Sequence, residues 1–286
     1  MPELPEVETL ARFLRDRCVG RTVTRAELVA FACLKTTTPP CALIGHRIED
    51  VRRRGKFCCL GAGEWTLVTH LAHAGWLSWR DEMPAAPARP GRGPLALRVV
   101  LDDGAGFDLT EADTRKNLAV YVVRDVGDVP GLAALGPEPL DDTFTTDVLD
   151  DILDRAGAAH IKGVLRDQRT IAGIGNAYSD EICWAAGLSP FAAASRLDAG
   201  QRVVLFHVIR DVLTEGIASL DGLDARDLKP HKKAALRVHG RTGEPCPVCS
   251  TPIADVSFAE SSLQYCPACQ TGGRVLADRR LSRLLK

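Results

Sequence analysis

Four of the ten cysteines form two Cys-x-x-Cys pairs, Cys246 with Cys249 and Cys266 with Cys269, and sixteen residues separate the pairs. Two such pairs on a spacer of hairpin length can bring four thiolates to the corners of a tetrahedron, the closed arrangement of a structural zinc site. A redox-active pair would occur singly in a thioredoxin-like context, which this sequence lacks. We therefore predict one structural Zn²⁺ held by these thiolates. The other six cysteines are expected to be ordinary thiols: Cys18, Cys33, Cys41, Cys58, Cys59 and Cys183.

The N-terminus offers a second reactive group. The initiator methionine is usually removed before a small residue, which would leave Pro2 with a free secondary amine. An α-amino group has a pKa near ~8, so part of it is neutral at pH 7 and can attack an electrophilic carbon to form an iminium. Glu3 beside it could transfer protons. Taken alone, these two residues also suit a plain helix start, with a proline in the first turn and an acid that complements the helix dipole.

A third candidate is the turn Gly173-Ile174-Gly175-Asn176, which lies between two helical stretches. Its two glycines allow a tight turn that exposes backbone N–H groups at the start of the next helix, and such groups can hold a phosphate. The Asn176 amide would add another donor. The same turn could equally serve only to pack two helices together.

Charge and composition narrow the functional classes. The chain of 286 residues is 45% hydrophobic and 26% charged, which suits two globular domains. No apolar stretch is long enough to span a membrane, and acids stand where a signal peptide would be basic, so we expect a cytoplasmic protein. The net charge of −1 hides an uneven distribution: residues 226–286 carry 11 Lys/Arg against 5 Asp/Glu, and residues 130–225 carry 7 against 15. A basic C-terminal module could sit against phosphates, although it could also be a solvated tail.

The predicted secondary structure divides the chain into three sections, and the first consists of a helix followed by strands. Helical spacing begins at Leu4 and should end at Gly20. Short runs rich in Val, Leu, Thr and aromatic residues then predict a β-sandwich. The runs are 28–34, 48–60, 67–79, 95–101, 107–109 and 118–123, with a hairpin turn at 102–106 and a loop at 84–94.

A stretch rich in proline and glycine, 131–142, separates these strands from a helical section. Apolar residues at three- and four-residue spacing predict helices over 144–155, 161–165, 177–186 and 199–213. The predicted domains are 1–130 (β-sandwich), 131–239 (helical) and 240–286 (zinc ribbon with a basic tail).

Six motifs then occur in a fixed order along the chain. They are Pro2–Glu8, Gly55–Lys56, His70–Leu71, Lys162–Gln168, Gly173–Asn176 and the cysteine ribbon ending in Cys269–Gln270. Together they closely resemble the formamidopyrimidine-DNA glycosylase / endonuclease VIII family of bifunctional base-excision repair enzymes. The resemblance implies an α+β protein with an N-terminal helix and β-sandwich, a helix-two-turn-helix domain and a C-terminal zinc ribbon. It also implies a monomer, associated with the nucleoid, whose partner is damaged or abasic DNA.

The resemblance assigns roles to individual residues. Pro2 would attack C1′ of the damaged nucleotide, Glu3 would act as acid and base, and Lys56 would complete the catalytic set while holding a phosphate. Because a base must leave the stack before a buried amine can reach its sugar, phosphate contacts that favour eversion fit this chemistry. The residues expected to contact DNA are His73, Arg115, Lys116, Asn117, Lys162 and Asn176.

Three positions depart from the family pattern. The family usually has an apolar wedge, a methionine, at His73, and a second wedge, a phenylalanine, at Asn117. It usually has a phosphate-binding arginine at Ser261. Each loss could remove ~1–3 kcal/mol of contacts in a distorted DNA complex. The candidates to compensate are the basic residues Arg274, Arg279 and Arg280.

The function expected from sequence is a base-excision repair DNA glycosylase with AP-lyase activity, which forms an imine at Pro2 and cleaves the strand by elimination. The alternative is a weakly catalytic or non-catalytic paralogue that binds abasic or distorted DNA. Retention of Pro2, Glu3 and Lys56 favours the enzyme, whereas Ser261 favours the binder. A zinc-ribbon module for protein interaction would leave the N-terminal residues unexplained.

Overall fold

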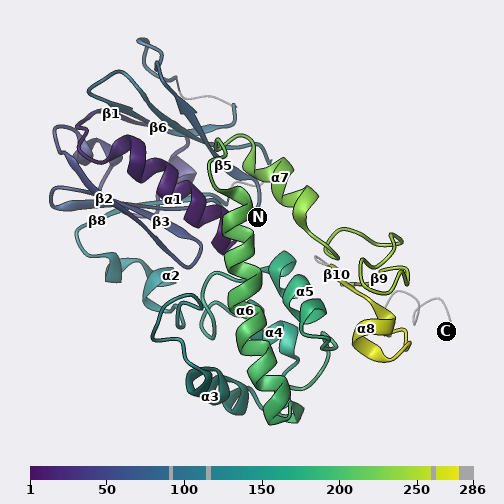
Figure 1. Cartoon of the computed structure of the whole chain (residues 1–286). Coiled ribbons are helices and arrows are strands. Elements are labelled where there is room, and N and C mark those ends of the chain that lie inside the picture. The colour runs from purple at the N-terminus through teal and green to yellow at the C-terminus, as the bar shows by residue number, and fades with distance from the viewer. Residues whose placement is uncertain (90–92, 114–116, 259–261, 277–286) are drawn as a thin grey trace. The chain divides into compact units, whose positions relative to one another are not determined.

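The computed structural model describes residues 1–89, 93–113, 117–258 and 262–276 (Figure 1). The chain divides into two compact units, which are described separately. Unit 1 comprises Met1–Leu135 with Leu220–Lys229, and unit 2 comprises Gly136–Ser219 with Pro230–Lys286. Within the described residues, no helix is both long and apolar enough to cross a membrane.

Unit 1 begins with helix α1 (Leu4–Cys18), as the sequence predicts. Pro5 lies in its first turn, and Glu6 accepts the backbone N–H of Glu3 at 2.7 Å, which satisfies one of the donors that a helix start leaves unpaired. Two polar contacts fix the helix on the neighbouring strand: Glu8 pairs with Arg53 at 3.0 Å, and Arg15 donates to the Val51 carbonyl at 2.7 Å.

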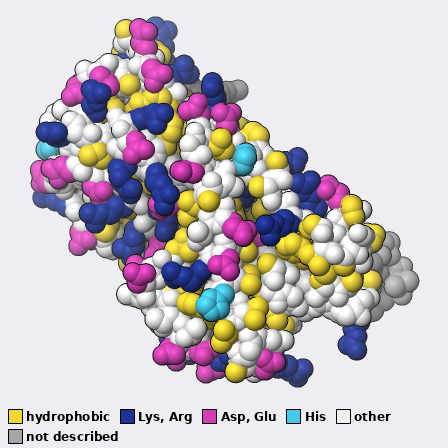
Figure 2. Space-filling view, viewed as in Figure 1, with side chains coloured by type: hydrophobic (Ala, Val, Ile, Leu, Met, Phe, Trp, Pro, Cys, Tyr) yellow, Lys and Arg dark blue, Asp and Glu magenta, His cyan; other side chains and the backbone are white. Residues whose placement is uncertain are grey.

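Eight strands of unit 1 form two antiparallel sheets. One sheet has the order β1 (Val23–Leu28), β6 (Leu95–Leu101), β7 (Gly106–Glu111) and β5 (Gly75–Arg80). The other has the order β2 (Ile48–Arg54), β3 (Phe57–Ala62), β4 (Trp65–His70) and β8 (Ala119–Val123). Buried residues of both sheets and of α1 belong to one apolar cluster, so the predicted β-sandwich is confirmed. Its surface carries interspersed acidic and basic side chains (Figure 2).

Three predicted strands were wrong in extent. The run 28–34 contributes only the end of β1, because Phe31–Cys33 is a short 3₁₀ helix. The run 48–60 is divided into β2 and β3 by a turn at Gly55, whose φ is +55°. The run 67–79 is divided into β4 and β5 by a turn at 71–74. By contrast, the hairpin turn at 102–106 joins β6 to β7 as predicted.

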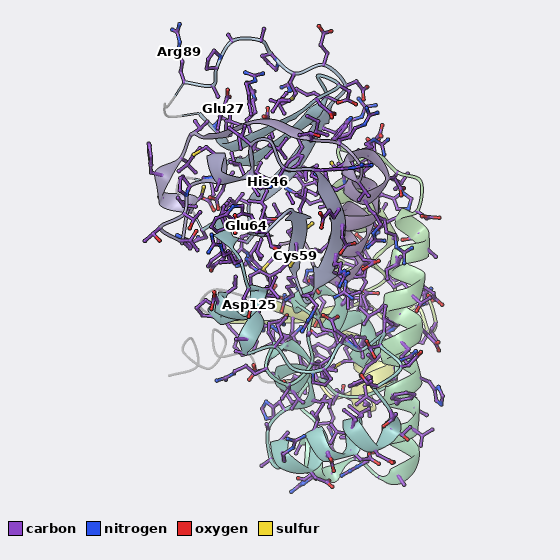
Figure 3. The ribbon with its side chains drawn as sticks, turned by 90° about the vertical axis from the view of Figure 1, so that its left-hand side faces the viewer. Glu27, His46, Cys59, Glu64, Arg89 and Asp125 are labelled. Atoms are coloured by element: carbon purple, nitrogen blue, oxygen red, sulfur yellow. The ribbon has the colours of Figure 1, made fainter. Side chains whose placement is uncertain are left out.

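Vicinal cysteines in β3 face opposite sides of their sheet. Cys58 packs against the main core. Cys59, labelled in Figure 3, belongs to a separate cluster with Val123 and Val129. Burial raises the pKa of the Cys59 thiol to about 11, so it is unreactive at neutral pH.

Three connections lie at one edge of the β-sandwich. His70, at the end of β4, pairs with Phe57 at the start of β3 and with Ala119 at the start of β8. In the other sheet, Gly75 at the start of β5 pairs with Glu111 at the end of β7. The turn before β3, the turn 71–74 and the connection from β7 to β8 therefore meet at the same edge. We call it the polar edge, because it carries Lys56, His70, His73, Glu111 and Asn117.

The remaining elements are short helices of unit 1 and the helices and hairpin toward the C-terminus. They are η1 (Phe31–Cys33), η2 (Pro40–Leu43), η3 (Val126–Asp128), α2 (Pro130–Ala133), α3 (Thr146–Ala156), α4 (Ile161–Arg166), α5 (Asn176–Ala185), η4 (Ala194–Arg196), α6 (Ala199–Leu220), α7 (Leu228–Ala235), β9 (Ala254–Ser257), β10 (Ser262–Tyr265) and α8 (Pro267–Thr271). The four predicted helices are present, and α6 extends seven residues beyond its predicted end at Leu213. Helix α7 lies in a basic stretch for which no helix was predicted. The four-cysteine hairpin belongs to the same compact unit as α3, α4 and α5.

Candidate metal centre and nucleic-acid interface

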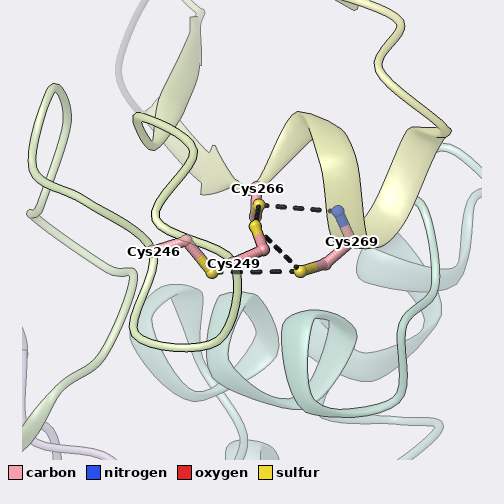
Figure 4. Close-up of side chains that lie close together, drawn as sticks. All are labelled: Cys246, Cys249, Cys266 and Cys269. Carbon is pink, nitrogen blue, oxygen red and sulfur yellow. Dashed lines mark hydrogen bonds between the residues drawn. The ribbon is translucent and has the colours of Figure 1, made fainter.

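The four predicted ligands converge in unit 2 (Figure 4). The sulfur atoms of Cys246, Cys249, Cys266 and Cys269 all lie within 4.8 Å of one another. The Trp184 indole N–H points at the Cys246 sulfur at 3.4 Å, and the Cys269 backbone N–H at the Cys266 sulfur at 3.5 Å. Four clustered soft ligands with N–H donors around them fit a closed tetrahedral Zn²⁺ site. The predicted cysteine cluster is confirmed.

The cysteine hairpin is attached to α5 by side chains of that helix. The Asn176 amide donates to the Ser262 carbonyl at 2.8 Å, at the start of β10. Glu181 accepts the backbone N–H groups of Arg237, Val238 and His239 at 2.8 to 2.9 Å, just before the hairpin. Helix α5 therefore fixes the chain before the first cysteine pair and again before the second pair.

Lys162, which was predicted to contact DNA, is held inside unit 2. Its side chain is buried, and its ammonium donates to Asp180 at 2.5 Å, to Ser179 at 2.9 Å and to the Asn176 carbonyl at 3.0 Å. An ammonium has three protons, and all three are used here. Reaching a DNA phosphate would break a buried ion pair. In this structure Lys162 anchors the first turn of α5, and its contact with DNA stays a prediction.

Sequence reasoning missed Asp180, Glu181 and His239. Asp180 is fully buried and accepts from Lys162 on one oxygen, while its other oxygen lies 2.7 Å from Nδ1 of His239. Two consecutive acids within an otherwise apolar helix were the available signal, because buried carboxylates need partners. Asn176 carries a related signal: its Oδ1 is the one buried side-chain oxygen or nitrogen of the described residues that has no hydrogen-bond partner. This oxygen is an acceptor, so the partner that it lacks is a hydrogen-bond donor.

In unit 1 the N-terminal residues are enclosed. Pro2 is buried, Glu3 is 3% exposed and Glu6 is 1% exposed. Met1 is 42% exposed, so the residue that must be removed to free the Pro2 amine lies at the surface. The contact of Glu6 with the Glu3 backbone fixes the start of the chain at the first turn of α1.

The polar edge combines buried and exposed polar residues. Lys56 is 7% exposed, directly before β3, and His70 packs against Phe57 with ring centres 4.8 Å apart and ring planes tilted by 47°. Nδ1 of His70 accepts the Ala72 N–H at 3.3 Å, and Ala72 has a φ of +49°, which is uncommon for a residue with a Cβ. His70 therefore supports the turn that carries the exposed His73. Burial, and then the positive charge of Lys56, lower the pKa of His70 to about 4, so the ring is neutral and can accept this hydrogen bond.

The structure describes only some of the other residues that were predicted to contact DNA. Asn117 is exposed, and its backbone N–H is held by Glu111 at 2.8 Å. Arg274 is exposed after α8. The following positions lie outside the described residues: Arg115, Lys116, Ser261, Arg279 and Arg280.

The metal centre generates a prediction about folding. Replacing Cys266 with serine should abolish zinc binding and unfold the hairpin, because so small a module has little apolar core of its own. Metal analysis should give one zinc per chain for the wild type and near zero for Cys266→Ser. Amide exchange at Cys246 and Ile253, which are hydrogen-bonded across the hairpin, should become fast. Cys41→Ser, at an exposed cysteine outside the cluster, is the control and should retain zinc. Full zinc content in Cys266→Ser would contradict the assignment.

His70 generates a prediction about pH. Its folded pKa of about 4 lies below the ordinary value of 6.5, so the unfolded chain takes up a proton first as pH falls. The stability supplied by neutral His70 is therefore complete above pH 6.5 and is lost as pH falls toward 4. His70→Asn keeps an acceptor for the Ala72 N–H but does not titrate. Between about pH 7 and pH 4.5, urea unfolding should show the wild type losing on the order of 2 kcal/mol more than the variant. Equal losses would show that His70 does not titrate as described.

Comparison with known proteins places the chain among its relatives. It matches the formamidopyrimidine-DNA glycosylase N-terminal domain over residues 1–120, the H2TH domain of the same proteins over 135–226, and the zinc finger found in FPG and IleRS over 243–272. The formamidopyrimidine-DNA glycosylase of Chloroflexus aggregans is 39% identical over 283 residues, covering 94% of this chain and 98% of that protein. An uncharacterized formamidopyrimidine-DNA glycosylase-like protein of Mycobacterium tuberculosis is 51% identical over 157 residues, covering 55% of this chain and 98% of that protein.

Solved structures agree with this placement. The Lactococcus lactis Fpg in complex with DNA containing an abasic site superposes with a TM-score of 0.81 at 27% identity, covering 94% of this chain and 99% of that one. The MutM (FPG) protein of Thermus thermophilus superposes with a TM-score of 0.77 at 32% identity, covering 94% and 98%. The sequence, the fold and the cysteine centre together show that the chain belongs to the formamidopyrimidine-DNA glycosylase family.

Proposed function

We propose that this protein is a base-excision repair DNA glycosylase with AP-lyase activity that acts through the amine of Pro2. The observation that carries the proposal is the enclosed N-terminus, where Pro2 and Glu3 are buried together at the start of α1. A further support is that the Lactococcus lactis relative binds DNA with an abasic site.

The proposed reaction uses groups of unit 1. Once Met1 is removed, the neutral Pro2 amine attacks C1′, and the bond from C1′ to the damaged base breaks as the base leaves with a proton. The sugar ring opens to give an iminium between Pro2 and C1′. Loss of a proton from C2′ then expels the 3′ phosphate and cleaves the strand. Glu3 moves the protons, because it adjoins the amine and its burial keeps water from competing.

Phosphate binding is proposed for groups in both units. Lys56 would hold a phosphate from the polar edge, and Asn176 would hold one from the first turn of α5. Arg274 and the basic residues beyond it would add sequence-independent affinity. The same proposal divides the chain into a catalytic β-sandwich domain (1–130), a DNA-binding helix-two-turn-helix domain (131–239) and a zinc ribbon with a basic tail (240–286).

The exposed residues of the polar edge suggest how the opposite strand is read. His73 and Asn117 are polar, whereas the corresponding family positions are usually apolar wedges. We propose that they hydrogen-bond to the base left unpaired by eversion, so that preference for the opposite base differs from the family norm. If the enzyme lacked turnover, the same groups would serve the second candidate function, a protein that binds abasic or distorted DNA. Ser261 in place of an arginine is the observation that favours this candidate.

Borohydride trapping on abasic duplex DNA tests the proposal. The wild type should form a covalent complex, Pro2→Gly should form less, and a short N-terminal extension should form none because it converts the amine to an amide. Glu3→Gln should slow release of a damaged base by about 10²-fold or more. Lys35→Ala, at an exposed lysine remote in sequence from the catalytic set, is the control and should trap normally. Undiminished trapping by a form that retains Met1 would transfer the role to a lysine, and binding without any trapping would favour the second candidate.

A further inference from the structure

Glu111 is an acid in an apolar position. It is the last residue of β7, only 2% of it is exposed, and it faces Gly75 across the β5–β7 pairing. Its backbone N–H donates to the Pro94 carbonyl at 2.7 Å, so its own main chain is fixed on the other side as well. Burying a carboxylate is costly unless hydrogen bonds replace its water. The buried carboxylate is therefore expected to have hydrogen-bond donors around it.

Two backbone N–H groups at the start of the segment leading into β8 are the donors to this carboxylate. One oxygen, Oε1, accepts the backbone N–H groups of Asn117 at 2.8 Å and of Leu118 at 3.0 Å. Two consecutive amides on one charged oxygen fix the direction of the chain as it enters β8. Charge-assisted hydrogen bonds of this kind are stronger than neutral ones. Glu111 thus sets the backbone from which the Asn117 side chain projects.

The same contact relates Asn117 to His73. Leu118 is fully buried, and its Cδ1 lies 3.0 Å from the position that a Cβ on Gly75 would occupy. Gly75 also ends the turn that carries His73, where a Cβ would lie 2.1 Å from the Leu71 carbonyl oxygen. The two chain segments pack so closely here that displacement of one affects the other.

We propose that Glu111 is a positioning residue for recognition of the opposite strand: its carboxylate holds Asn117 beside His73 so that both can meet the unpaired base. This inference rests on the function proposed above. Glu111 acts through the backbone of Asn117. Its loss should therefore change how the opposite base is read and leave the chemistry at Pro2 intact.

The test compares Glu111→Leu with Glu111→Gln, which keeps an oxygen able to accept both N–H groups. Leu109→Ala, at a buried core residue of the same strand, is a control for general loss of stability. Each protein is trapped with borohydride on a single-stranded abasic oligonucleotide and on abasic duplexes with each of the four opposite bases. Amide exchange is followed at Asn117 and Leu118.

Glu111→Leu should trap about tenfold or more slowly on the wild type's preferred duplex and should discriminate less among opposite bases, because the N–H groups of Asn117 and Leu118 lose their acceptor. Trapping on the single strand should persist, and Glu111→Gln should recover most of the discrimination. In an Asn117→Gly background, Glu111→Leu should have little further effect on discrimination.

Three results would overturn the inference. They are unchanged discrimination in Glu111→Leu, an equal loss on single-stranded and duplex substrates, and the same change of profile in Leu109→Ala. A wild type that traps neither substrate would overturn the proposed function together with this inference. A wild type that traps both, accompanied by any of the three results, would overturn this inference alone.

Discussion

Two strand pairings at one edge of the β-sandwich determine where the functional groups of unit 1 lie. His70 pairs with Ala119 in one sheet, and Gly75 pairs with Glu111 in the other, so the two connections between the sheets must run over the same edge. A shift of one residue in either pairing would turn every side chain of that strand to the opposite face. The register is fixed because the inward faces supply the apolar core that the sandwich shares with α1. Core packing and site geometry therefore depend on the same pairings.

Both units bury ionisable groups near the residues assigned to function. In unit 1 Glu3, Glu6, Lys56 and Glu111 are each at most 7% exposed. In unit 2 the buried ion pair of Lys162 with Asp180 supports the first turn of α5. Buried charges are weak contributors to stability, because desolvation offsets much of the attraction between partners. Their more direct effect is orientation, since hydrogen bonds fix the side chains of Glu6, Glu111 and Lys162.

How far the sequence predicted the structure depended on the range of the interactions involved. The four-cysteine centre and the start of α1 were predicted correctly, because their signals are spacing and local capping. The turn at 71–74 was missed because apolar residues continue through Leu71, Ala72 and Ala74, and periodicity does not distinguish a buried corner from a strand. The turn at Gly55 was missed although a glycine between charged residues marks it. The burial of Lys162 was missed because its partner Asp180 lies 18 residues away and becomes a neighbour only when α4 packs on α5. The buried role of Glu111 likewise depends on contacts outside its strand.

The proposed function depends most on the amine of Pro2 as the nucleophile, with the polar edge binding the DNA around it. The most direct measurement is mass-spectrometric mapping of the borohydride-reduced complex with an abasic oligonucleotide, after digestion of both protein and DNA. We expect a sugar remnant on the nitrogen of Pro2, in an N-terminal peptide that lacks Met1, because the α-amine is less protonated at neutral pH than the lysine amines. A remnant on the side chain of Lys56, or on any other lysine while Pro2 is unmodified, would contradict it.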